Sequence, residues 1–188
     1  MIVLNKIKII IKKNKIKTFI LFLSFIAFIF CLPNNLFNKS YSTVLVDANN
    51  QLLCAQIADD GQWRFPVSDS VPVKFKDCIL TFEDEYFNFH LGINPVSIIK
   101  SIKRNITSGK IESGGSTITM QVARMMRGNN KRNYIQKIIE MIIAFRIECS
   151  YSKKSILNIY TSNAPFGSNV VGLSAASWRY FGRDARNL

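Results

Sequence analysis

Hydrophobic positions follow three different patterns along the chain. The stretch from Thr18 to Leu32 is apolar and carries no charge. From Thr43 to Ile57, apolar and polar residues alternate on either side of Asn49-Asn50, which is typical of two strands joined by a turn. After Pro72 the spacing of apolar residues changes to about 3.6, which is typical of amphipathic helices. The pattern therefore predicts an apolar segment, a small β-hairpin and a mainly α-helical domain.

The helical part is predicted to contain six helices. The first follows apolar positions from Val73 to Phe87, and a short run from Trp63 to Val67 precedes it. Residues 38–70 are therefore expected to form a linker with a hairpin, and residues 71–188 a single domain. The remaining helices are expected at roughly 95–107, 117–127, 133–150, 153–161 and 172–181.

The apolar segment is close to the length of a membrane span. A span needs about 20 residues, so we predict a transmembrane anchor over 18–37, with its last residues in the interface. A cleaved signal peptide is the alternative, but no small-x-small site follows the apolar run. Six lysines and no acid precede the segment. Residues 1–17 are therefore expected to be a basic cytoplasmic tail, in a single-pass protein of the inner (cytoplasmic) membrane whose later residues lie outside.

Composition narrows the class of protein. Lys and Arg number 25 against 12 Asp and Glu, giving a net charge of +13, so the partner is expected to be anionic. Nucleic acid, anionic lipid and phosphate-bearing substrates all remain open on charge alone. The four cysteines show no CxxC spacing and are expected to be small buried hydrophobes. With His90 as the single histidine, a His-rich metal centre or a Ser-His-Asp triad is disfavoured.

One block that could carry chemistry runs from Glu83 to Gly92, where acids lie among aromatic residues at a helix end. A carboxylate beside aromatic rings is partly desolvated, which suits it to general-base work. An exposed acidic helix end is the alternative.

Two further blocks carry the other candidate groups. Gly114 to Arg124 is a glycine-rich turn leading into a helix, and the amides and hydroxyls at a helix start bind phosphate. An ordinary helix cap is the alternative. Lys137 and Glu140 stand three residues apart on the next helix, where a surface salt bridge is the simplest interpretation. Taken together, paired carboxylates suit chemistry at a glycosidic bond, and the cations suit a phosphate leaving group.

The three blocks resemble the peptidoglycan glycosyltransferase domain (glycosyltransferase family 51) of class A penicillin-binding proteins, most closely the 1C type. The first fits E-D-x-x-F-x-x-H-x-G at every fixed position, and the second fits G-G-S-T-x-T-x-Q-x-x-[KR]. Residues 137–140 fit the last four positions of R-K-x-x-E. The segment from Ser152 to Phe181 is similar to a fourth stretch, S-K-x-x-I-L…Y…F-G…G…A-A…Y-F.

The resemblance implies a lysozyme-like, mainly α fold that polymerises lipid II outside the membrane. Glu83 would remove the proton from the 4-hydroxyl of the acceptor sugar, and undecaprenyl pyrophosphate would depart with inversion at the anomeric carbon. Glu140 would orient the donor pyrophosphate. Substrate contacts are expected from Asp84, Phe87, Ser116, Thr117, Gln121, Arg124 and Lys137.

The implied partners are lipid II, the growing glycan strand, the membrane and other proteins of cell wall synthesis, but not nucleic acid. No cofactor is required, although a divalent cation, Mg²⁺ or Mn²⁺, is a candidate at the donor pyrophosphate. The basic amphipathic stretch 98–106 is expected to dip into the lipid surface, with an ordinary half-buried helix as the alternative.

The chain departs from the family pattern at several positions. Gln136 stands where an arginine is usual, and Asn158 where a glutamate is frequent. Because the family continues with further helices and usually a transpeptidase domain, the domain at 71–188 is expected to be incomplete. Two S-x-x-K strings occur, but no K-[ST]-G follows them, so no transpeptidase activity is expected. A lytic transglycosylase and an inactive membrane-tethered scaffold that binds lipid II are the rival functions.

Overall fold

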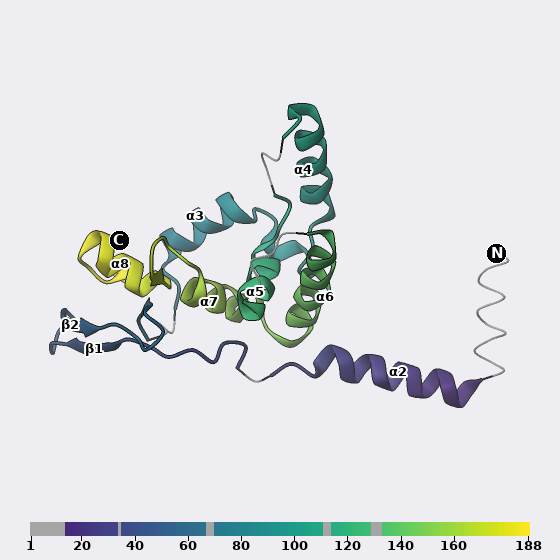
Figure 1. Cartoon of the computed structure of the whole chain (residues 1–188), viewed down its shortest axis with the longest axis horizontal. Coiled ribbons are helices and arrows are strands. Elements are labelled where there is room, and N and C mark those ends of the chain that lie inside the picture. Colours follow the sequence, from purple (N-terminus) through teal and green to yellow (C-terminus); the bar gives the residue numbers. More distant parts are fainter. Residues whose placement is uncertain (1–13, 34, 67–69, 111–113, 129–132) are drawn as a thin grey trace. The chain divides into compact units, whose positions relative to one another are not determined.

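A computed structural model describes residues 14–33, 35–66, 70–110, 114–128 and 133–188. The chain divides into two units, Met1–Asn34 and Asn35–Leu188. The first contains helix α2, Lys15–Phe30, drawn in purple in Figure 1. Most of the predicted basic tail lies outside the described residues, and only its last lysines, Lys15 and Lys17, fall within α2.

Helix α2 is 16 residues long and buries none of them, and it is apolar apart from Lys15, Lys17, Thr18 and Ser24. Within the part of the chain that the structure describes, no helix is both long and apolar enough to cross a membrane. The transmembrane helix predicted over 18–37 is therefore not found. The helix ends at Phe30, three residues before Pro33, and a proline disfavours helical conformation in the residue that precedes it.

The second unit begins with the predicted hairpin, formed by β1 (Thr43–Val46) and β2 (Leu52–Gln56) in antiparallel register. The turn is held by Asp47, whose carboxylate accepts a hydrogen bond from the Asn49 amide at 2.8 Å. Asn50 adopts a left-handed conformation with φ of 61°, which asparagine tolerates better than most residues.

The short run at Trp63 is not part of the hairpin. Strand β3 (Trp63–Arg64) pairs in parallel with β4 (Val170–Val171), so the linker is tied to the C-terminal part of the unit. A small core supports this pairing, made by Val170, Ala175 and Ala176 with Trp63, Phe65 and Phe166 packed against them.

The described part of the second unit contains six α-helices close to the predicted ranges, which confirms a mainly helical fold with small sheets. Helices α4, α5, α6 and α7 each begin at a side-chain cap, supplied by Asn94, Thr117, Asn133 and Ser152. The bounds are α3, Val73–Glu83; α4, Pro95–Ser108; α5, Ile118–Arg127; α6, Tyr134–Ser150; α7, Lys153–Asn163; and α8, Leu173–Phe181, with short 3-10 helices η1, Phe87–Phe89, and η2, Ala185–Asn187.

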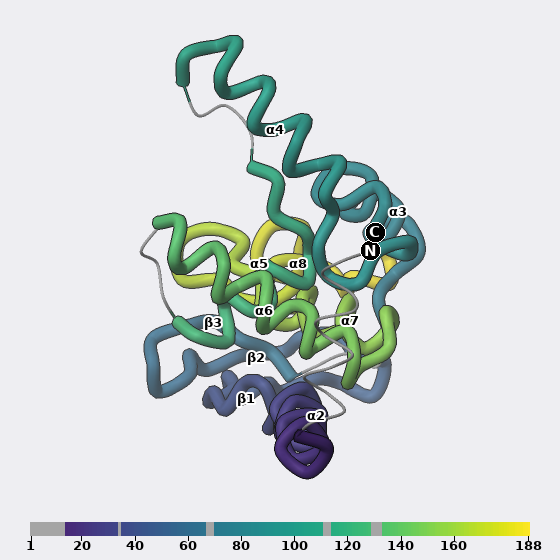
Figure 2. The backbone as a smooth tube through the Cα atoms, turned by 90° about the vertical axis from the view of Figure 1, so that its right-hand side faces the viewer, coloured from purple at the N-terminus to yellow at the C-terminus, as the bar shows by residue number. Residues whose placement is uncertain are grey.

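Helix α5 is the centre of this unit. It packs against α6 and α7, as Figure 2 shows. Four of its apolar side chains are fully buried: Ile118, Met120, Val122 and Ala123. Helix α4, in contrast, extends away from these helices in both views (Figures 1 and 2). The unit therefore presents one well-buried helix that can position side chains, and one helix with little cover.

Two predictions about local structure were wrong. Helix α3 ends at Glu83 instead of reaching Phe87, because Asp84 leaves the helical conformation (φ −162°, ψ 72°). Cys54 and Cys78 are exposed, as is Cys31 in the first unit, so these three are not buried hydrophobes.

Candidate active site

Glu83 occupies the last position of α3 and is partly exposed. The Gln121 side-chain amide donates a hydrogen bond to Oε2 of Glu83 at 2.7 Å. The Tyr160 hydroxyl lies 3.5 Å from the amide oxygen of Gln121. Burial, and secondly the nearby charge of Glu83, raise the pKa of Tyr160 to about 12. The phenol therefore stays protonated well into the alkaline range and faces the Gln121 amide oxygen as a donor.

Glu140 lies on α6 and is buried, with 4% of its surface exposed. Arg124 binds it through two parallel hydrogen bonds, Nε to Oε1 at 2.7 Å and Nη2 to Oε2 at 2.9 Å. Hydrogen bonding to this carboxylate raises the pKa of Arg124 above its ordinary value. A two-point pair of this kind fixes the plane of the guanidinium group.

Ser116 joins a second cation to this pair. Nη2 of Arg124 lies 3.4 Å from the Ser116 hydroxyl, and the Lys137 ammonium also donates to that hydroxyl. All three side chains are partly exposed. The result is a polar surface that carries two positive groups and a hydroxyl, next to a buried carboxylate.

Helix α5 connects the two carboxylates. Gln121 holds Glu83 and Arg124 holds Glu140, and these two α5 residues stand three apart, which places them on one face about 5–6 Å from each other. The structure thus brings together six of the predicted site residues: Glu83, Ser116, Gln121, Arg124, Lys137 and Glu140. Their roles in catalysis and substrate binding stay predictions.

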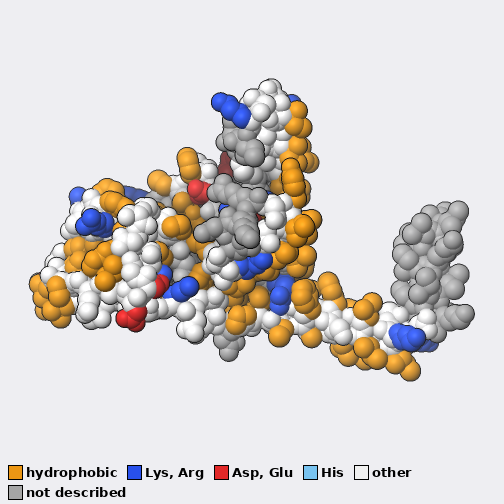
Figure 3. Space-filling model, viewed as in Figure 1, with side chains coloured by type: hydrophobic (Ala, Val, Ile, Leu, Met, Phe, Trp, Pro, Cys, Tyr) orange, Lys and Arg blue, Asp and Glu red, His pale blue; other side chains and the backbone are white. Residues whose placement is uncertain are grey.

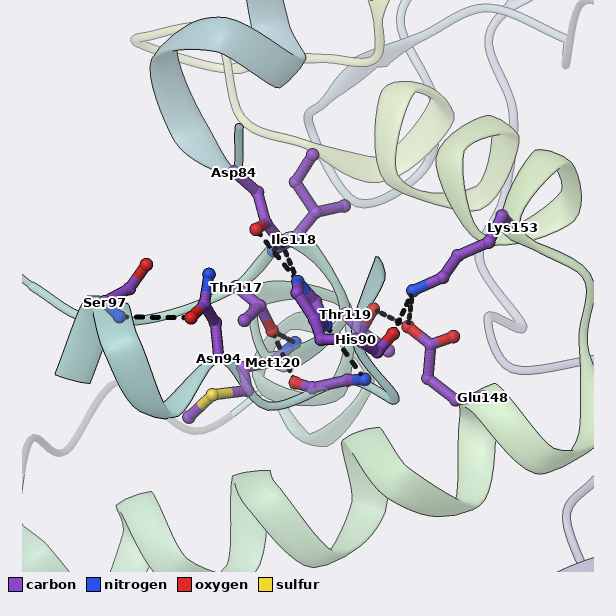
Figure 4. A network of polar contacts seen from close by, with 11 residues as sticks. Asp84, His90, Asn94, Ser97, Thr117, Ile118, Thr119, Met120, Glu148 and Lys153 are labelled. Atoms are coloured by element: carbon purple, nitrogen blue, oxygen red, sulfur yellow. Dashed lines mark hydrogen bonds and ion pairs between the residues drawn. The ribbon is translucent and has the colours of Figure 1, made fainter. Parts of the chain in front are cut away.

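Asp84 has a different environment from its neighbour Glu83. Its carboxylate is buried and accepts hydrogen bonds from Nε2 of His90 at 2.9 Å and from the Ile118 amide at 3.0 Å (Figure 4). The Gly92 amide donates to Nδ1 of His90 at 3.1 Å, so the imidazole proton lies on Nε2. Asp84 thus binds the first residue of α5, where a carboxylate is favoured by the helix dipole.

Thr117 anchors the start of α5 to the same segment. Its hydroxyl accepts a hydrogen bond from the Met120 amide and donates to the Gly92 carbonyl at 2.6 Å. Gly92 has φ of 79°, and a Cβ there would lie 2.9 Å from the Ala144 backbone on α6. Only glycine fits this position, and its fit brings α6 against the segment that follows Glu83.

An ion pair between a partly exposed lysine and a buried carboxylate completes the framework in Figure 4. The Lys153 ammonium donates to Oε1 of Glu148 and to the His90 carbonyl, both at 2.7 Å. It also lies 4.4 Å from the centre of the Phe87 ring. Thr119 donates to the same Glu148 oxygen at 2.6 Å. Helices α5, α6 and α7 are therefore all fastened to the segment that carries Glu83.

The predicted site residues separate into two groups in the structure. Glu83, Ser116, Gln121, Arg124 and Lys137 are partly exposed and grouped around α5. Asp84, Phe87 and Thr117 are buried and make the framework contacts just described. Any contact of these three with substrate stays a prediction.

Sequence reasoning missed His90, Thr119, Glu148, Lys153 and Tyr160 as parts of the site. Four of them fall at fixed positions of the quoted motifs, and that signal could have suggested a role for His90, Thr119, Lys153 and Tyr160. Glu148 lies five residues before Lys153, and nothing in the spacing indicates that it is buried.

The residues around Glu140 do not fit a divalent cation held by the protein. Among the described residues no three His, Cys, Asp or Glu side chains gather at a point. Both oxygens of Glu140 already accept hydrogen bonds from Arg124, and Lys137 adds a second positive charge nearby. A metal ion at the donor pyrophosphate stays a prediction.

Comparison of the sequence with models of known protein families shows which family the chain belongs to. The model of the family described as Transglycosylase matches residues 50–188. The chain belongs to the transglycosylase family. The matched range contains helices α3 to α8 and both carboxylates, so the resemblance found in the motifs is confirmed at the level of the family.

The chain is similar to several curated proteins. It is 40% identical over 130 residues to penicillin-binding protein 1C of Escherichia coli, covering 69% of this chain and 17% of that protein. It is 32% identical over 148 residues to penicillin-binding protein 1F of Bacillus subtilis, covering 78% and 20%. A biosynthetic peptidoglycan transglycosylase of Acinetobacter baumannii is 36% identical over 120 residues, covering 64% and 53%. The chain thus matches about a sixth to about half of the length of these relatives.

Proposed function

We propose that this protein is a peptidoglycan glycosyltransferase with a lysozyme-like fold, which polymerises lipid II into glycan strands. The observation that carries the proposal is the pairing of two carboxylates by one helix, with Gln121 holding Glu83 and Arg124 holding Glu140. One relative carries the name biosynthetic peptidoglycan transglycosylase, which supports the same reaction.

In the proposed reaction Glu83 is the general base. Its Oε1 accepts no hydrogen bond from a described residue, while Gln121 fixes Oε2. The free oxygen takes the proton from the 4-hydroxyl of the acceptor sugar as that hydroxyl oxygen bonds to the anomeric carbon of the donor. The bond from the anomeric carbon to the pyrophosphate breaks, and its electron pair leaves with undecaprenyl pyrophosphate. Attack from the opposite face gives inversion.

The basic surface at Ser116 is proposed to receive the pyrophosphate. Arg124 and Lys137 both reach the Ser116 hydroxyl, so two cations converge on one point. Preorganised cations stabilise the charge that develops on a leaving group. Glu140 contributes by holding the Arg124 guanidinium in a fixed plane, which supports an orienting role for this carboxylate.

Helix α4 is proposed to contact the membrane surface in which a polyprenyl substrate resides. Ile99, Ile102 and Ile106 form one stripe of this helix and are 67%, 52% and 77% exposed. Figure 3 shows hydrophobic side chains along this edge of α4. Lys100 and Lys103 lie beside the stripe. An apolar face flanked by lysines is typical of a helix lying in a lipid interface, whereas an ordinary half-buried helix would cover these isoleucines.

The proposal is tested by incubating the purified full chain, reconstituted in lipid vesicles, with labelled lipid II. We expect long glycan strands in the wild-type reaction and none with Glu83→Gln. Cleavage of preformed strands without polymer would favour the lytic transglycosylase. Retention of lipid II without any product would favour the scaffold.

A further inference from the structure

A cleft of about 350 Å³ lies between α3 and α7, and neither carboxylate lines it. Gln121, Arg124 and Lys137 do not line it either. Clefts that bind small molecules are commonly about 300–1,000 Å³. This cleft is therefore large enough for a small ligand and separate from the proposed reaction centre.

The lining of this cleft has a definite chemical character. Leu80, Phe87 and Leu157 provide an apolar floor, and Lys76 and Lys154 are exposed lysines at its edge. No described residue pairs with the ammonium group of either lysine. Among the described residues that line the cleft there is no aspartate or glutamate to neutralise them. Among the described residues, the cleft thus combines two lysines that have no acidic partner with apolar surface.

We propose that the cleft between α3 and α7 binds a small anion with an apolar body of about the size of an aromatic ring. The apolar body packs on Leu80, Phe87 and Leu157, and the anionic group lies between Lys76 and Lys154. This site is additional to the proposed lipid II site and does not depend on it.

Occupation of the cleft has a structural consequence. Phe87 and Lys153, which both line it, also hold the segment after Glu83, because the Lys153 ammonium binds the His90 carbonyl and lies over the Phe87 ring. Leu80 is one turn before Glu83 on α3. A bound ligand therefore restrains residues 84–92 from their outer side.

The probe is 3-phenylpropionate, which carries one carboxylate and one aromatic ring. Affinity is measured by calorimetry on the full chain in lipid nanodiscs, and hydrogen–deuterium exchange locates the site. We expect slower exchange in residues 84–92 and at the start of α7. The double variant Lys76→Gln/Lys154→Gln should bind about tenfold more weakly or worse, since each lysine contributes a charged contact.

Matched controls separate this site from general charge attraction. The variant Lys39→Gln/Lys74→Gln removes two exposed lysines that do not line the cleft and should bind as the wild type does. Acetate and 3-phenyl-1-propanol, which lack the ring and the charge respectively, should bind at least about tenfold more weakly than the probe. Unchanged affinity in the Lys76/Lys154 variant, equal binding of acetate, or protection centred on α5 and α6 would each overturn the proposal. Because the readouts are binding and exchange, they are independent of glycosyltransferase activity.

Discussion

Glu83 and Asp84 are neighbouring acids with opposite surroundings. Glu83 is partly exposed and accepts one side-chain hydrogen bond, from Gln121. Asp84 is 5% exposed, and its carboxylate binds both His90 and the first amide of α5. One carboxylate oxygen of Glu83 remains available to a substrate, whereas both oxygens of Asp84 accept hydrogen bonds from other parts of the fold. Adjacent positions of one motif therefore combine the proposed general base with a carboxylate that holds the surrounding segment in place.

The glycine-rich turn repeats this division. Ser116 is partly exposed between Arg124 and Lys137, while its neighbour Thr117 is 1% exposed and bonded to Gly92 and Met120. The Ile118 and Met120 amides at the start of α5 already donate to Asp84 and Thr117, so they are not available to bind phosphate as the sequence analysis expected. In the proposed function, anion binding at this turn therefore falls to Arg124, Lys137 and the Ser116 hydroxyl.

The largest effect is expected from a change to Glu83, the proposed general base in this comparison. Glu83→Gln keeps the size of the side chain and removes its ability to take a proton. General-base catalysis typically contributes about 10²- to 10⁴-fold in rate, so polymerisation should fall by at least that factor. Because the side chain is only partly buried, the melting temperature should stay near that of the wild type. Polymerisation at close to the normal rate by a folded variant would remove Glu83 from this role.

Arg124 and Lys137 provide the next contrast, because both reach Ser116, and Arg124 in addition makes a two-point pair with the buried Glu140. Lys137→Gln should lower turnover by about tenfold to a hundredfold with little effect on stability. Arg124→Gln should also lower the free energy of unfolding by about 3 kcal/mol, since it leaves a buried carboxylate without its partner. Urea unfolding and polymerisation of both variants measure this. Equal stability of the two would show that the Glu140 pair contributes little to the fold.

A smaller effect is expected for the framework acid. Asp84→Asn removes the charge from a buried group that binds His90 and the Ile118 amide, and a hydrogen bond to a charged group is worth about 1.5–3 kcal/mol. The melting temperature should fall by several degrees, while Glu85→Gln, an exposed neighbouring acid, should leave it unchanged. A variant as stable as the wild type but as inactive as Glu83→Gln would instead place Asp84 in contact with substrate.

Much of this architecture could be predicted from the sequence because its helices are strongly periodic. The predicted starts of α4, α5 and α6 agree with the structure within a residue because Asn94, Thr117 and Asn133 cap these helices. The end of α3 was missed, because it depends on Asp84 reaching a helix that lies over thirty residues later. The Glu148–Lys153 pair was missed for the same reason, since burial of an ion pair depends on tertiary packing.

The smallest expected effect concerns Tyr160, behind Gln121 on the Glu83 side. Its pKa is raised from 10.0 to about 12, so the folded chain keeps a proton that the unfolded chain loses above pH 10. The stabilisation is complete below pH 10 and is lost as the pH rises through about 12, and its magnitude is about 1–2 kcal/mol. Tyr160→Phe should therefore flatten the fall in stability between pH 10 and 12, as measured by urea unfolding, whereas Tyr86→Phe, at an exposed phenol, should not. The same slope in wild type and Tyr160→Phe would mean that the phenol is not held protonated beside Glu83, and that Gln121 is oriented by Glu83 alone.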